Sequence, residues 1–236
     1  MSLYRGRVFP LLAGNLWAIF LFLDMTDLAD STWIKFAGIC LCCLTALLGA
    51  VTFDSRLVAA ALCLTVGADW FLLVMDRHYT AGIALFLLVQ SIYAYRLYLF
   101  RGKCASRSGL ALRFLFFLLS LLTALLPVIV FRHWWEGPPR IVPLQEAWRI
   151  FTTFLPIFYF FTLLVNTLEA FALGRTRPLF AIGLLLFTCC DICVGAWNLG
   201  LLPGFTRIGM WLFYLPSQVL IVLSQEEREA HHETRL

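Results

Sequence analysis

Two aspartates, Asp69 and Asp191, lie inside apolar runs that are long enough to form membrane-spanning helices. A charged side chain at the centre of a bilayer costs about 2.5–3.5 kcal/mol or more. Leucine would fill either position without this cost. Ionisable residues inside a membrane therefore indicate a functional site, and we take both carboxylates as catalytic candidates.

Polar side chains follow each aspartate on the next predicted span. The candidates for binding substrate are Gln90, Tyr93, Asn166, Tyr214 and Gln218. The first two follow Asp69 by one span, and the last two follow Asp191 by one span. Within each pair, the spacing of three or four residues places both side chains on one helix face. Each half of the chain therefore offers an aspartate and a polar helix face.

Two carboxylates in one poorly hydrated pocket repel each other, so we expect them to share one proton and to act as an acid and a carboxylate. Glycoside hydrolases use such a pair to cleave a C–O bond through an oxocarbenium-like transition state. The acid donates a proton, the carboxylate stabilises the cation, and water is then activated. The polar neighbours would orient this water or bind polar substrate atoms. At this depth the substrate must be a lipid or another amphiphile.

The composition predicts a membrane protein. The chain has 61% hydrophobic and 14% charged residues, whereas soluble globular chains have roughly 45–50% apolar and about 25% charged residues. The mean hydropathy is +0.86. No basic stripe with interleaved aromatic residues indicates nucleic-acid binding. The bilayer and a lipid substrate are the expected partners.

The apolar runs predict an all-α, polytopic transmembrane helical bundle of about eight spans, forming a single integral membrane domain over residues 1–236. The expected spans are 9–23, 33–51, 57–75, 80–100, 110–131, 148–169, 178–199 and 205–224. We count eleven Lys and Arg residues on the side of the termini and six on the other side. This imbalance favours a multi-pass topology with both termini in the cytoplasm.

The two aspartates have nearly the same predicted depth. Asp69 lies about six residues from the outer end of the third span, and Asp191 lies about eight residues from the outer end of the seventh. At about 1.5 Å rise per residue, both lie roughly 9–12 Å below the outer boundary. Four spans in each half are compatible with a parallel 4+4 repeat, which would direct both aspartates to one central cavity.

For the other polar residues of the spans we expect structural roles. Arg96 and Arg101 near the inner end of the fourth span are expected to snorkel to the headgroups, and Glu169 is expected at the interface. We expect no metal, because no histidine lies in a span and zinc prefers Cys and His ligands from separated segments. No cofactor-binding motif is present either.

Several motifs resemble the signatures of the YhhN/lysoplasmalogenase family of membrane proteins. In the first half, the segment 66–73 with the later positions Gly82, Phe86, Gln90 and Tyr93 resembles the pattern G-D-x-x-L followed by G-x-x-x-F-x-x-x-H-x-x-Y. In the second half, the segments 166–168, 187–191 and 214–221 resemble the patterns N-T, F-x-x-S-D and Y-x-x-x-Q-x-L-I. Three positions differ from the family pattern: Gln90 replaces histidine, Ala68 replaces glycine and Cys190 replaces serine.

This resemblance implies eight transmembrane helices and hydrolysis of the vinyl-ether bond of lysoplasmalogens, which releases a fatty aldehyde and a glycerophospho-alcohol. It also implies that Asp69 and Asp191 are the catalytic pair. The alternatives are a proton- or cation-coupled transporter, a non-catalytic lipid-binding protein, and a scaffold in which each aspartate bonds locally. A hydrolase predicts that both carboxylates meet in one place, whereas a scaffold predicts separate surroundings.

Overall fold

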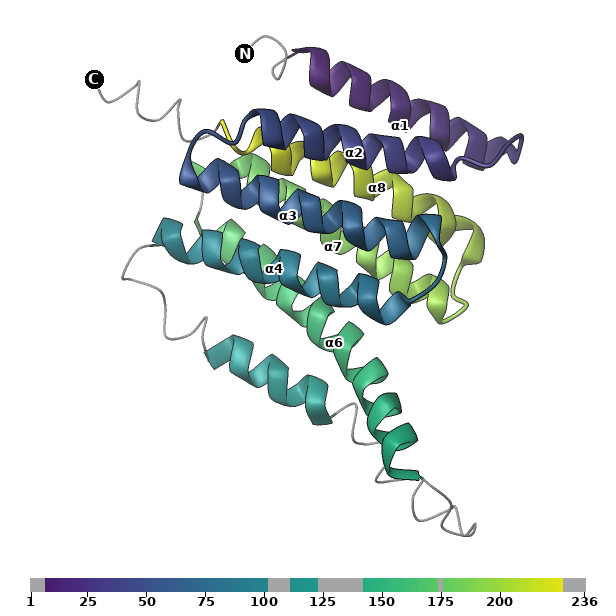
Figure 1. Ribbon diagram of the computed structural model, residues 1–236, viewed down its shortest axis with the longest axis vertical. Coiled ribbons are helices and arrows are strands. Elements are labelled where there is room, and N and C mark those ends of the chain that lie inside the picture. Colours follow the sequence, from purple (N-terminus) through teal and green to yellow (C-terminus); the bar gives the residue numbers. More distant parts are fainter. Residues whose placement is uncertain (1–6, 102–110, 123–141, 174–175, 227–236) are drawn as a thin grey trace.

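The computed structural model describes residues 7–101, 111–122, 142–173 and 176–226 (Figure 1). All regular elements within these ranges are helical. They are α1 (Phe9–Thr26), α2 (Thr32–Leu48), α3 (Phe53–Asp69), the π-helical turn η2 (Trp70–Val74), α4 (Tyr79–Arg101), helix Ala111–Leu122, α6 (Val142–Ala172), α7 (Pro178–Asn198) and α8 (Pro203–Leu223).

Six helices of the described chain are long and apolar enough to cross a bilayer. Two shorter apolar helices, α2 and Ala111–Leu122, accompany them. The predicted all-helical, polytopic bundle of about eight helices is therefore confirmed. The remainder of the predicted fifth span and both chain termini lie outside the described residues.

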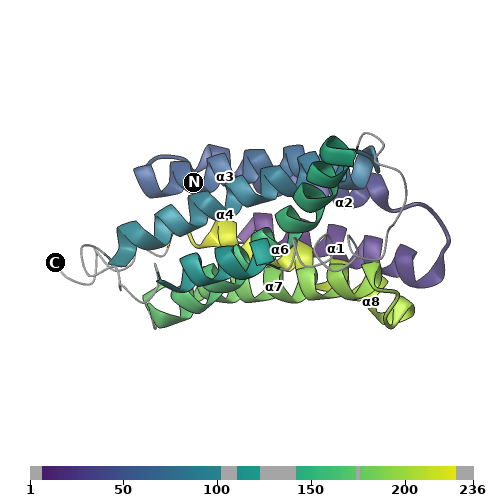
Figure 2. The same ribbon diagram turned by 90° about the horizontal axis from the view of Figure 1, so that it is seen from below.

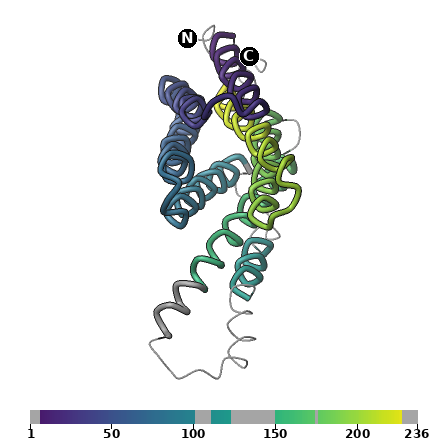
Figure 3. Tube along the Cα trace, turned by 90° about the vertical axis from the view of Figure 1, so that its right-hand side faces the viewer, coloured from purple at the N-terminus to yellow at the C-terminus, as the bar shows by residue number. Residues whose placement is uncertain are grey.

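The helices form a closed ring of neighbours. Each of α2, α3, α4, α6, α7 and α8 contacts the next, and α8 also contacts α2. Figure 3 views this arrangement along the helices, and Figure 2 shows α3 on one side, α7 and α8 on the other, and α4 and α6 between them. Helix α1 packs outside the ring, against α2 and α8. Helices far apart in the sequence therefore share one interior.

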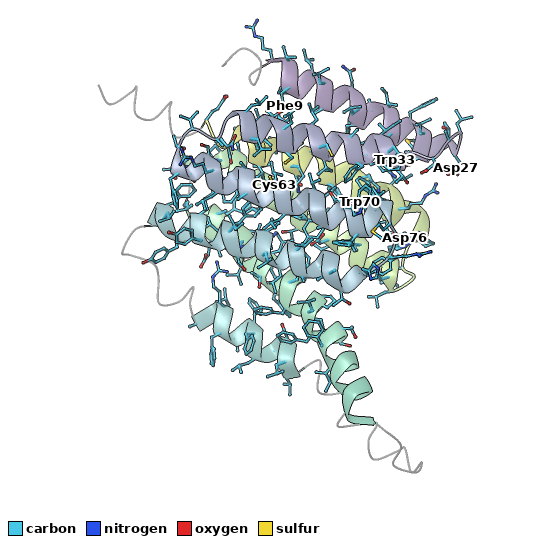
Figure 4. The ribbon with its side chains drawn as sticks, viewed as in Figure 1. Phe9, Asp27, Trp33, Cys63, Trp70 and Asp76 are labelled. Carbon is cyan, nitrogen blue, oxygen red and sulfur yellow. The ribbon has the colours of Figure 1, made fainter. Side chains whose placement is uncertain are left out.

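The two ends of the bundle differ, and we name each after a buried cation. At the Lys35 end, Lys35 pairs with Asp24 at 2.7 Å. Trp33 and Trp70 are exposed at this end, and Figure 4 shows them near the charged residue Asp27. Exposed tryptophans beside charged groups are typical of the headgroup level of a membrane.

At the Arg96 end, a buried ion pair joins three helices. Arg96 of α4 is fully buried and donates to both carboxylate oxygens of Asp54, at 2.7 and 2.9 Å. It also donates to Ser224 Oγ at 2.8 Å, just after α8. The expectation that Arg96 snorkels to the headgroups is therefore wrong. Asp54 offers it a bidentate partner inside the protein, which satisfies the guanidinium without water.

Helix α3 begins earlier than expected and changes its winding at Asp69. Thr52 and Ser55 form a capping box that starts the helix at Phe53 rather than at residue 57. Directly after Asp69 the chain forms a π-helical turn, in which Met75 N–H donates to Trp70 O at 2.9 Å. Single π-turns within α-helices are rare and frequent at functional sites.

Helices α7 and α8 approach closely at Gly183. A Cβ atom at this position would lie 2.9 Å from Ile221 Cγ1 and 3.2 Å from the Ser217 carbonyl oxygen of α8. Small residues allow such close backbone contact between membrane helices. Gly183 therefore fixes the position of α8 relative to α7, the helix that carries Asp191.

Candidate active site

Asp69 is held by a tyrosine from the other half of the chain. Tyr214 Oη of α8 donates a hydrogen bond to Asp69 Oδ2 at 2.7 Å. Both side chains are buried, with 4% and 5% of their surface exposed. In the sequence Tyr214 follows Asp191 by one span, whereas the fold places its hydroxyl on Asp69.

Asp191 is held in the same manner by Tyr159 of α6, which donates to Asp191 Oδ2. Asp191 itself is only partly buried. The sequence analysis did not single out Tyr159. A signal was available, because Tyr159 precedes Asn166 by seven residues, or about two helical turns, and therefore shares its helix face.

The two tyrosines belong to one aromatic cluster. The Phe86 ring of α4 lies 5.9 Å from the Tyr159 ring and 6.4 Å from the Tyr214 ring. Phe187 of α7 lies 5.7 Å from both Phe86 and Tyr214. The Phe86 ring therefore links the tyrosine that holds Asp69 to the tyrosine that holds Asp191. The structure therefore brings the aspartates of α3 and α7 to one region of the interior, which the scaffold hypothesis does not predict.

Within the described part of the chain, no ion pair reaches Asp69 or Asp191. The ion pairs of the described residues involve other carboxylates, those of Asp24, Asp27, Asp54 and Glu169. Two carboxylates in an aromatic, poorly hydrated environment without a cation cannot both be ionised at low cost.

The side chain of Asn166 forms hydrogen bonds with Gln90 and Arg113 and not with the aspartates. Its Nδ2 donates to the Gln90 carbonyl oxygen at 2.8 Å and to Gln90 Oε1 at 3.0 Å. Its Oδ1 accepts from Arg113, which also pairs with Glu169 at 2.5 Å. Asn166 therefore links α4 and α6 to helix Ala111–Leu122. Glu169, which we expected at the interface, is a partner in this network.

Tyr93 and Gln218 are buried, and their ring contact and hydrogen bond involve residues other than the two aspartates. The Tyr93 ring packs against Phe180 at 5.5 Å, and Gln218 Nε2 donates to Ser217 Oγ at 3.2 Å. Of the five polar candidates, Tyr214 is the one whose hydrogen bond reaches either aspartate in the described structure. The others occupy the interior closer to the Arg96 end.

The hydrogen bonds do not follow the suggested 4+4 repeat. Asp69 accepts from α8, which is not adjacent to α3 in sequence, whereas Asp191 accepts from α6, the helix directly before α7. A repeat would place both donors on equivalent helices. The relation between the halves therefore stays a prediction, and the two carboxylates have different surroundings.

Comparison with known families decides the affiliation of this chain. The model of the YhhN family matches residues 30–225. The chain belongs to the YhhN family. Searches of curated proteins and of solved structures give no match. The YhhN match covers all six helices of the ring, with both aspartates and both tyrosines that hold them, and leaves α1 outside.

Proposed function

We propose that this protein is a membrane-embedded hydrolase that cleaves the vinyl-ether bond of a lysophospholipid by acid–base catalysis with Asp69 and Asp191. The observation that carries the proposal is the pair of carboxylates held by two tyrosines of one aromatic cluster. Membership of the YhhN family supports it, because that family suggests a hydrolase.

The first step is protonation of carbon. The protonated carboxyl donates its proton to the alkenyl carbon that is not bonded to oxygen, which turns the vinyl ether into an oxocarbenium ion. The remaining carboxylate stabilises this cation, and the apolar surroundings strengthen that interaction. The tyrosine hydroxyls hold each carboxylate in place, so little reorganisation is needed when the charge develops.

Water completes the reaction. It adds to the oxocarbenium carbon and gives a proton to the carboxylate, which forms a hemiacetal. The hemiacetal then collapses. Its hydroxyl proton goes to a carboxylate, and the original ether bond between this carbon and the glycerol oxygen breaks. The glycerol oxygen takes a proton from the carboxylic acid as it leaves. The products are a fatty aldehyde and a glycerophospho-alcohol, and the aspartate pair regains its single proton.

The exposure of the two aspartates supports a lipid substrate. Asp69 is buried, whereas Asp191 is partly accessible on a helix whose next residue, Ile192, is exposed. An apolar residue exposed on a membrane helix faces lipid. A single-chain lipid entering beside Asp191 from the bilayer would meet the aspartate pair without passing through water.

The decisive experiment measures aldehyde release from a 1-alkenyl lysophospholipid by the purified protein. We expect turnover by the wild type and a loss of about 100-fold or more in Asp69→Asn and in Asp191→Asn, as for the removal of a general acid or base. Asp76→Asn, at an exposed aspartate near the start of α4, is the matched control and should keep full activity.

Two outcomes would contradict the proposal. The first is full turnover by either Asp→Asn variant of the pair. The second is no turnover by the wild type of vinyl-ether, alkyl-ether or ester lysophospholipids. The second outcome would favour a proton- or cation-coupled transporter or a non-catalytic lipid-binding protein.

A further inference from the structure

Among the buried polar atoms without a hydrogen-bond partner in the described structure, three lie on α4 and α8: Gln90 Nε2, Tyr93 Oη and Gln218 Oε1. All three side chains are fully buried, so bulk water does not reach them. Buried polar atoms are nearly always paired with protein or with an ordered water molecule. These atoms therefore indicate a binding position for a small polar group.

The two glutamines each lie one helical turn beyond a ring contact that crosses the interior of the bundle. Phe86 of α4 and Tyr214 of α8 are in ring contact at 6.4 Å. Both helices run from the Lys35 end to the Arg96 end. Gln90 follows Phe86 by four residues and Gln218 follows Tyr214 by four residues. Each amide is therefore about one helical turn, or about 5 Å, further along the same face, directly behind the Tyr214–Asp69 hydrogen bond.

The free atoms of the two amides are complementary. Asn166 donates to Gln90 Oε1 at 3.0 Å, which leaves Gln90 Nε2 as a donor. Gln218 Nε2 donates to Ser217 Oγ at 3.2 Å, which leaves Gln218 Oε1 as an acceptor. One donor and one acceptor match a water molecule, and buried waters make about three hydrogen bonds. Tyr93, one turn beyond Gln90 on the same face, offers the third.

We propose that Gln90 and Gln218 bind one water molecule behind the aspartate pair and that this water is the nucleophile of the hydrolysis, an inference that rests on the proposed function. The water oxygen forms the new C–O bond to the oxocarbenium carbon, and its proton passes to the aspartate carboxylate. The lipid and the water then approach the aspartates from different sides. A wet interior behind the pair allows hydrolysis while the lipid side stays apolar.

Variants at Gln218 test the role of this water. Gln218→Met keeps the length of the side chain and removes the acceptor. We expect kcat to fall by about 10-fold or more with KM within about twofold of the wild type, since water activation and not lipid binding is affected. Gln218→Glu keeps an acceptor oxygen and should restore part of the rate. Gln90→Met should lower kcat in the same way.

Thr65→Val is the matched control for loss of a buried polar group. Thr65 is fully buried on α3, and its hydroxyl donates to the Ala61 carbonyl oxygen of its own helix. We expect its kcat to equal that of the wild type. If Thr65→Val lowered kcat as much as Gln218→Met at equal thermal stability, the loss would reflect general packing, and the inference would be overturned.

A partition experiment reports on the water itself. Methanol added to the assay competes with water for the oxocarbenium ion and gives a mixed acetal in place of the aldehyde. In the wild type the bound water is already in place to attack, so the aldehyde should predominate. Gln218→Met weakens the binding of this water and should raise the fraction of acetal. A purely structural role of Gln218 would leave this ratio unchanged, and an unchanged ratio would overturn the nucleophile role.

A high-resolution experimental structure separates this inference from the proposed function. Density for a water within hydrogen-bonding distance of both Gln90 Nε2 and Gln218 Oε1 supports the binding position, and absence of that density overturns it, whatever the activity. If the wild type hydrolyses no vinyl ether, the proposed function and the nucleophile role fail together. If it hydrolyses the lipid and both Met variants keep the wild-type kcat, only the further inference fails.

Discussion

Tyr214 donates its hydroxyl to Asp69 across 145 residues of sequence, at the point where α3 changes from α-helical to π-helical turns. Tyr159 makes the equivalent contact with Asp191, and one phenylalanine, Phe86, touches both tyrosine rings. The aspartates of α3 and α7 are therefore joined through side chains of three other helices, α8, α4 and α6. Their relative position depends on the closure of the whole ring.

Removing the hydroxyl of either tyrosine should slow the reaction without removing the carboxylates. We expect Tyr159→Phe and Tyr214→Phe each to lower kcat by about 10- to 100-fold, since a hydrogen bond to a charged group contributes about 1.5–3 kcal/mol. Tyr79→Phe is the control, because Tyr79 also bonds an aspartate, Asp76, but at an exposed position. Aldehyde release under saturating lipid measures all three. Wild-type kcat in both site variants would show that the tyrosines do not position the aspartates.

Breaking the buried pair at the Arg96 end should destabilise the fold strongly. Arg96→Met removes both guanidinium hydrogen bonds of buried Asp54 and leaves it only the longer ion pair with Arg177 at 4.0 Å. Breaking a buried pair by removing one partner costs about 3–5 kcal/mol. The double variant Arg96→Met with Asp54→Leu should lose less free energy of unfolding than the two single variants together. Denaturant unfolding in detergent or in mixed micelles measures these differences.

The exposed pair Arg207–Asp27 provides the contrast. Its side chains are 48% and 72% exposed at a separation of 2.9 Å. Arg207→Ala should cost no more than about 1 kcal/mol, as is usual for surface pairs. Equal losses in Arg96→Met and Arg207→Ala would contradict the assignment of the Arg96 pair as a buried link between α3, α4 and α8.

Filling the contact between α7 and α8 should separate these helices. Gly183→Leu places a side chain where a Cβ atom would already lie 2.9 Å from Ile221. We expect a loss of about 1–3 kcal/mol, typical of overpacking. Gly195→Leu on the same helix is the control, because nothing lies within 4 Å of a Cβ atom there. The assignment of Gly183 as the contact point would be wrong if both variants unfolded at the same temperature.

The orientation predicted from the charge distribution places the Lys35 end on the non-cytoplasmic side. In a variant without native cysteines, Asp76→Cys should react with a membrane-impermeant maleimide from outside intact cells. Thr176→Cys, exposed at the opposite end of the bundle, should react only after permeabilisation. The reverse labelling pattern would invert the topology and place both termini outside.

Most of the fold was predictable because a bilayer imposes simple rules. Backbone groups in lipid must be paired within a helix, so long apolar runs report helices directly. The predicted ends of the helices were less accurate than their number and order. The polar residues before residue 57 looked like a loop, although Thr52 and Ser55 cap the helix and Asp54 is buried by its pairing with Arg96. A hydropathy profile counts Asp54 as polar, because it takes no account of the cation that pairs with it in the fold.

The site was predictable in its aspartates and not in their partners. An intramembrane aspartate is conspicuous in the sequence because of its cost, and so Asp69 and Asp191 could be named. A tyrosine is ordinary in a membrane span, so Tyr159 gave little signal. The spacing on α8 put Tyr214 and Gln218 on one face, but the neighbour of that face was decided by the contact of α8 with α2 and α3.

The sequence by itself therefore determined that this protein is a helical membrane bundle with two costly carboxylates at similar depth. It did so because hydrophobic length and buried charge are local properties of a chain. Only the tertiary structure decided that Tyr214 donates to Asp69, that Tyr159 donates to Asp191, and that Phe86 of α4 meets the Tyr214 ring of α8. These relations depend on the order in which helices meet around the ring, which arises from packing such as the close approach at Gly183 and cannot be read from any single span.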